Sequence, residues 1–105
     1  MSLHITASVA VQALEEQGYF SLGMVSPIDS YFVNPQTGEV AHALTTGGGS
    51  RLFFDKLSQS DIFAILVACI RYERCGSEPA PVRELAEERM NALYPDGWVV
   101  GGNTP

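Results

Sequence analysis

The segment that most constrains the fold is the run from Ile62 to Ile70, where nine consecutive residues are apolar. It follows residues 58–61 (Ser-Gln-Ser-Asp), and a serine three positions before an acidic residue is typical of a helix start. A helix that is apolar nearly all round must be covered on more than one side. Because a membrane span needs about 20 apolar residues, the run predicts a buried core helix over 61–75, ended by Gly76.

The length of the chain limits how completely such a helix can be covered. The chain has 105 residues, of which 46% are hydrophobic. This size fits a single domain over residues 1–105, with residues 1–3 disordered or left from cloning and residues 101–105 frayed. Small domains leave much of their surface exposed, so a second subunit is an economical way to complete the cover. We therefore expect a homodimer.

The charge of the chain argues against two classes of partner. The net charge is −6, with six Lys and Arg against twelve Asp and Glu. The basic residues are too few and too scattered to neutralise a run of phosphates, which disfavours nucleic acid. Anionic membranes are disfavoured on the same ground. Since the sequence shows neither a signal peptide nor a disulfide framework, we expect a cytoplasmic protein.

The rest of the chain alternates between helical and strand periodicity. Amphipathic helices are expected over 6–17, ended by Gly18, and over 82–94. Between the first of these and the core helix the period falls to two, which predicts antiparallel strands joined by turns. The expected strands are 20–24, 31–33, 39–45 and 51–54. The fold class is therefore α+β, a two-layer sandwich with an N-terminal helix, an antiparallel three- to four-stranded meander and then two helices, in the order αβββ(β)αα.

Three local features leave alternatives open. The meander either has three strands or gains a fourth at residues 51–54. Residues 98–100 form either an edge strand or a plug over the core. Residues 47–50 (Gly-Gly-Gly-Ser) predict a flexible loop. Bare amides at Gly47–Gly49 beside Arg51 would also suit an anion. They do not match a Walker loop, because a strand rather than a helix follows.

Residues with catalytic or metal-binding chemistry form no recognisable pattern. His42 lies between Val40 and Leu44. Catalysis would require the fold to bring a carboxylate or nucleophile to it, and no nearby spacing predicts one. His4 is the other histidine, and neither Cys-x-x-Cys nor His-x-x-x-His occurs. We therefore predict no catalytic residue, no cofactor and no metal, and a half-buried structural role for His42. An enzyme would instead bring His42 within hydrogen-bond reach of one of four side chains, namely Asp29, Asp55, Ser50 or Cys69.

Two surfaces are predicted as binding sites. Ala64 and Ala68 lie four residues apart and form a smooth strip that another helix can approach closely. Arg89 falls in the middle of an apolar helix face and must reach water or meet a carboxylate. The predicted interface consists of Ala64, Ala68, Arg71, Tyr72, Arg89 and Trp98. The alternative site is an apolar pocket between sheet and helices, lined by Phe20, Met24, Phe32, His42 and Phe54.

The balance of these observations favours a small acidic cytoplasmic protein that is not an enzyme. It is expected to act through protein–protein interaction, as a homodimer that also presents a surface to another protein. Antitoxins, immunity proteins and other accessory products of mobile elements share this size and charge, by analogy alone. The alternative is a small-molecule-binding domain with the apolar pocket described above.

Overall fold

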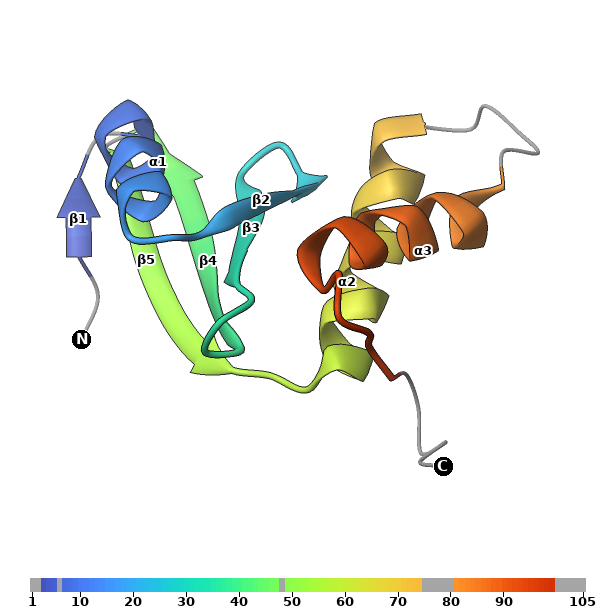
Figure 1. The fold of residues 1–105 in the computed structure, drawn as a ribbon. Coiled ribbons are helices and arrows are strands. Elements are labelled where there is room, and N and C mark those ends of the chain that lie inside the picture. The colour runs from blue at the N-terminus through green and yellow to red at the C-terminus, as the bar shows by residue number, and fades with distance from the viewer. Residues whose placement is uncertain (1–2, 6, 48, 75–80, 100–105) are drawn as a thin grey trace.

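The computed structural model describes residues 3–5, 7–47, 49–74 and 81–99. Its elements are β1 (Leu3–Ile5), α1 (Ala7–Glu16), β2 (Phe20–Ser26), β3 (Asp29–Asn34), β4 (Glu39–Thr46), β5 (Gly49–Lys56), α2 (Gln59–Arg74) and α3 (Val82–Leu93). The strands form an antiparallel sheet in the order β1-β5-β4-β3-β2 (Figure 1). The predicted α+β class and element order are confirmed, with β5 as the fourth strand of the meander. Strand β1 is an addition that the sequence did not predict.

Both faces of the sheet carry a hydrophobic core. In β3 and β4, Phe32 and Ala41 lie in a cluster with Leu14 of α1, whereas Val33 and Val40 lie in a cluster with α2 and α3. Neighbouring residues of a strand point to opposite faces. The helices are thus divided between the two faces, where a two-layer arrangement would gather them on one (Figure 1).

Helix α2 is the core helix that the apolar run predicts, but its cover is incomplete. Its bulky side packs against β2 and α3. The buried residues of α2 are Ile62, Phe63, Leu66, Cys69 and Ile70. Ala64 and Ala68 are exposed. The alanine strip therefore contacts no other helix in the described part of the chain, which corrects the expectation that α2 is shielded from every direction.

The predicted alternation along β2 is wrong at two positions. Leu22 is buried as expected, but Phe20 and Met24 are 55% and 40% exposed. The pairing of β2 with β3 shifts register twice along the strand. Phe20 pairs with Val33 before the first shift and stays on the face of Leu22, on the edge strand of the sheet. Met24 pairs with Ser30 beyond that shift and lies on the opposite face.

The glycine-rich segment is a tight hairpin, which corrects the expected flexible loop. Thr46 pairs with Gly49, and β5 begins at Gly49. Ser50 is 1% exposed, and its hydroxyl lies 2.8 Å from that of Thr45. The Ser50 hydroxyl is therefore turned into the sheet and is not available to an anion. Gly48 lies outside the described residues.

Trp98 closes the open end of the α2–α3 core. Its ring stacks on Phe63 with the centroids 5.8 Å apart, and its indole N–H donates to Oδ1 of Asn91 in α3 at 2.7 Å. Trp98 and Val99 belong to no strand. Of the two alternatives for this segment, the plug is therefore correct at Trp98, and Val100 lies outside the described residues.

Gly23 of β2 marks the closest approach between the sheet and α2. A Cβ atom built at this position would lie 3.0 Å from Cβ of Cys69 and 3.0 Å from a carboxylate oxygen of Glu73. Its φ angle is +118°, a conformation that glycine adopts without strain. A glycine is therefore needed here on two grounds, space and backbone conformation.

Replacing Gly23 by Ala should destabilise the fold more than replacing Gly97 by Ala. Gly97 has nearly the same φ angle, +117°, but nothing lies within 4 Å of a Cβ atom built there. Both variants carry backbone strain, and only Gly23→Ala adds the clash with α2, which is worth about 1–3 kcal/mol. Urea unfolding measures the difference. Equal losses would contradict a tight contact between β2 and α2.

Candidate functional site

An open hollow of about 320 Å³ lies on the sheet face that carries the α2–α3 core. We call it the His42 hollow. It is lined by residues of β3, β4, β5 and the segment after β5: Tyr31, Val40, His42, Phe53, Phe54, Asp55 and Leu57. The register places Tyr31 opposite His42 on one side and Phe53 opposite it on the other. His42 therefore occupies the middle of this face, on the strand between β3 and β5.

The imidazole of His42 is held by a carboxylate from the neighbouring strand. Its Nε2 atom lies 2.6 Å from Oδ1 of Asp29. Asp29 pairs with Leu44 in the register, so Asp29 and His42 are diagonal neighbours on one face. Asp29 is one of the four side chains whose contact with His42 the enzymatic alternative requires, and this contact is present. The two residues are 13 positions apart, and only strand pairing brings them together.

A signal for this contact was present in the sequence. The turn at 34–38 predicts a hairpin, and pairing the strands outward from Asn34 and Glu39 puts Tyr31 opposite His42. Asp29 then falls two positions from Tyr31 on the same face. The turn pattern leaves the pairing frame of the hairpin open, so the turn alone does not predict the contact.

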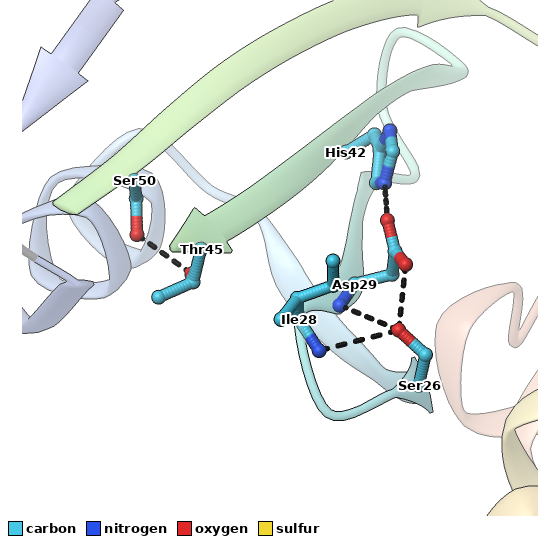
Figure 2. A network of polar contacts seen from close by, with 6 residues as sticks. All are labelled: Ser26, Ile28, Asp29, His42, Thr45 and Ser50. Atoms are coloured by element: carbon cyan, nitrogen blue, oxygen red, sulfur yellow. Dashed lines mark hydrogen bonds and ion pairs between the residues drawn. The ribbon is translucent and has the colours of Figure 1, made fainter. Parts of the chain in front are cut away.

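Ser26 completes the arrangement around Asp29. Its hydroxyl donates to Oδ2 of Asp29 at 2.6 Å and accepts the backbone N–H groups of Ile28 and Asp29 at 3.2 and 3.1 Å (Figure 2). The hydrogen bond from Ser26, followed by that from His42, lowers the pKa of Asp29 below its usual 3.8. Asp29 is therefore an ionised acceptor at neutral pH.

The hydrogen bond to Asp29 decides which nitrogen of His42 carries the proton. An ionised carboxylate can only accept, so Nε2–H donates to it. In the neutral imidazole this leaves Nδ1 as a hydrogen-bond acceptor. Figure 2 shows the second ring nitrogen turned away from Asp29. The structure gives Nδ1 no hydrogen-bond partner among the described residues.

Two aromatic rings fix the orientation of the imidazole. Tyr31 stacks on His42 with a centroid distance of 4.6 Å and an interplanar angle of 9°. Phe53 lies at 6.0 Å and is tilted by 35°. Because the two come from the strands on either side of β4, the imidazole sits between them. Its side chain is 29% exposed, so it is held but still reachable.

A catalytic site built on His42 would need a nucleophile beside the imidazole, and the described residues do not place one there. The Ser50 hydroxyl is hydrogen-bonded to the Thr45 hydroxyl and lies well away from His42 along the strands (Figure 2). Cys69 is 0% exposed, and burial is the main cause that raises the pKa of its thiol to about 11. Nor does the described part of the chain contain three His, Cys, Asp or Glu side chains placed to share a metal ion. What the site offers is hydrogen-bond acceptors beside aromatic faces.

The five residues of the predicted pocket do not come together. His42 and Phe54 line the His42 hollow. Phe32, next to Tyr31 in β3, points to the opposite face and is buried beneath α1. Phe20 lines a separate groove of about 170 Å³ between β2, α2 and α3, and Met24 is exposed. Alternation along β3 separates Phe32 from His42, and the register shift in β2 separates Met24. Phe20 is on the same face as His42 but lies on the edge strand β2, where it faces α2 and α3.

Two of the six predicted interface residues are used within the chain. Nη2 of Arg89 lies 3.3 Å from Oε1 of Glu73, which ties α3 to α2. Trp98 is the plug on Phe63. The other four are exposed on α2: Ala64, Ala68, Arg71 and Tyr72.

No protein-family model matches the chain, and neither a curated protein nor a solved structure matches it. Among the described residues, no helix combines the length and the apolar character needed to cross a membrane.

Replacing Ser26 by Ala should raise the pKa of Asp29, because the Ser26 hydrogen bond is the largest cause that lowers it. A folded-state pKa below the unfolded value stabilises the fold at pH above about 3.8, and this contribution disappears as the pH falls through the folded-state value. The variant should therefore lose part of its stability at neutral pH and little at low pH. Carboxyl ¹³C NMR titration measures the pKa, with Ser21→Ala on the same strand as control. An unchanged pKa of Asp29 would contradict the network.

Proposed function

We propose that the protein acts through protein–protein interaction and that its partner is a second copy of itself, bound through the outer side of α2. This proposal rests on the arrangement of four exposed residues, which we call the outer strip: Asp61, Ala64, Ala68 and Arg71. The side chains in the middle of the strip are small and uncharged, the residue at its N-terminal end is acidic, and the residue at its C-terminal end is basic. It is therefore complementary to itself when reversed.

The spacing of the strip supports an antiparallel pair of α2 helices. Positions 61 and 71, and positions 64 and 68, are symmetric about Leu66. When two copies lie antiparallel with Leu66 at the centre, Ala64 of one copy is level with Ala68 of the other, and Asp61 is level with Arg71. The charged residues then lie about 7.5 Å along the axis from the centre. In a two-fold dimer each contact occurs twice, so this arrangement forms two ion pairs.

The packing of the strip also favours a helix as its occupant. Alanine side chains allow helix axes to approach to the short end of the usual range of about 8–10 Å. The residues that flank the strip, Ile65 and Val67, are half-buried in the single chain and would lose further surface to water in the pair. Asp61 and Arg71 form no salt bridge with the described residues. Pairing across the interface supplies a partner for each.

The protein is further proposed to be non-enzymatic and to reside in the cytoplasm. We treat the protein as non-enzymatic, since the described residues place no nucleophile beside His42. The cytoplasm suits the free buried thiol of Cys69, because reducing compartments keep such thiols unpaired. The acidic character of the chain, with net charge −6, favours a protein partner over nucleic acid. The homodimer would still leave the His42 hollow open to a further ligand.

Sedimentation equilibrium at micromolar to millimolar concentration tests the pairing. The wild-type protein should reach twice the chain mass of 11.4 kDa. Asp61→Arg or Arg71→Asp alone should weaken the dimer about tenfold, because each turns two attractive pairs into repulsive ones. The double variant Asp61→Arg/Arg71→Asp restores opposite charges and should recover most of the affinity. A chain that stays monomeric at millimolar concentration would refute the proposal.

A second pair of variants separates packing from charge. Ala68→Lys places a long side chain in the middle of the outer strip and should abolish the dimer, while the thermal melting of the monomer changes little because Ala68 is exposed. Ala92→Lys makes the same change at an exposed alanine of α3 and should leave the dimer intact. Equal effects of the two variants on sedimentation would count against an interface on α2.

A further inference from the structure

We infer that the His42 hollow is a binding site for a small, flat organic cation. This site is separate from the outer strip of α2 and does not depend on the proposed dimer. Its volume of about 320 Å³ lies within the range of small-molecule sites, at the lower end. The inference follows from three properties of the lining: its ring faces, its charge and its hydrogen-bonding groups.

The walls of the hollow are rich in aromatic rings. Phe53 of β5 is 43% exposed, and Tyr31 and His42 form a stacked pair beside it. Ring faces attract cations as well as flat apolar groups. The hollow therefore offers stacking surface that water solvates poorly, within a few ångströms of polar groups.

The charge of the lining favours a positive ligand. Asp55 contributes a carboxylate whose Oδ1 accepts the backbone N–H of Lys56 at 2.9 Å and which forms no salt bridge with the described residues. Asp29 places a second ionised carboxylate behind His42. No lysine or arginine is among the residues that line the hollow. A cationic ligand would be attracted by the Asp55 carboxylate, whereas an anionic ligand would be repelled.

The hydrogen-bonding groups of the hollow also favour a cationic ligand. When the imidazole of His42 is neutral, its bond to Asp29 makes Nδ1 an acceptor. The carboxylate of Asp55 is an acceptor as well. A ligand that carries several N–H donors on a flat, positively charged group can satisfy both kinds of acceptor while its ring or plane stacks on Phe53. Amidinium, guanidinium and protonated heteroaromatic amines belong to this class.

Three probes of the same shape and different charge test the inference on the full chain. Benzamidinium, benzamide and benzoate carry charges of +1, 0 and −1, so shape is constant while charge varies. In ¹⁵N NMR titrations, benzamidinium should shift the amide signals of β5 around Phe53 and Asp55 with a Kd on the order of 1 mM. Benzamide should bind at least about tenfold more weakly, and benzoate should not bind.

Matched variants locate the site and its charge. Asp55→Asn should weaken benzamidinium about tenfold, whereas Asp96→Asn, at an exposed carboxylate in the turn after α3, should not. Phe53→Ala should weaken binding, whereas Phe20→Ala, in the groove beside α2, should not. Both phenylalanines are exposed, so neither change should unfold the chain.

Each of several outcomes would overturn the inference. Equal affinity for benzamidinium and benzamide would show an apolar site without charge selection. Equal losses in Asp55→Asn and Asp96→Asn would show attraction to the overall negative charge alone. Signals that move around Phe20 and not around Phe53 would place the ligand in the other groove. Benzamidinium selectivity lost in Asp55→Asn and kept in both control variants would support the inference.

Discussion

The contact between Gly23 of β2 and Cys69 of α2 is the constraint on which the arrangement of the molecule depends. The absence of a side chain at Gly23 lets α2 lie against the sheet at van der Waals distance. This brings the bulky side of α2 onto Leu22 and Val33, with Met90 of α3 closing the cluster. The same contact determines which side of α2 faces outward, and the outward side carries the outer strip.

The position of α2 also explains why the His42 hollow exists. Helices α2 and α3 sit at the β2–β3 end of the sheet (Figure 1). Toward β4 and β5 the same face has no helix over it, and there Phe53 remains exposed. His42 stands at the border of the covered and uncovered parts, where an imidazole can be held by Asp29 and still reach solvent. The position of α2 on the sheet thus leaves exposed both of the surfaces that are proposed as binding sites.

The predictions from sequence were correct where the signal is local. The apolar run and its start signal located α2 within two residues of its observed start. Gly38, at φ +80°, ends the turn that begins at Asn34, as the Pro and Gly positions indicate. The predictions from sequence failed where a residue's environment depends on distant parts of the chain. The sequence-based prediction places Phe32 and His42 in one pocket, although alternation along β3 and β4 puts them on opposite faces.

The sequence by itself determined the three helices and the four strands of the meander, where the main hairpin turns, and that one helix has to form the core. These depend on periodicity and turn chemistry within about ten residues of chain. Only the tertiary structure decided that Asp29 meets His42, that Ser50 is buried, and that Ala64 and Ala68 stay uncovered. Strand register and the choice of which face a helix covers are settled by packing between residues far apart in sequence, and no local pattern encodes that packing.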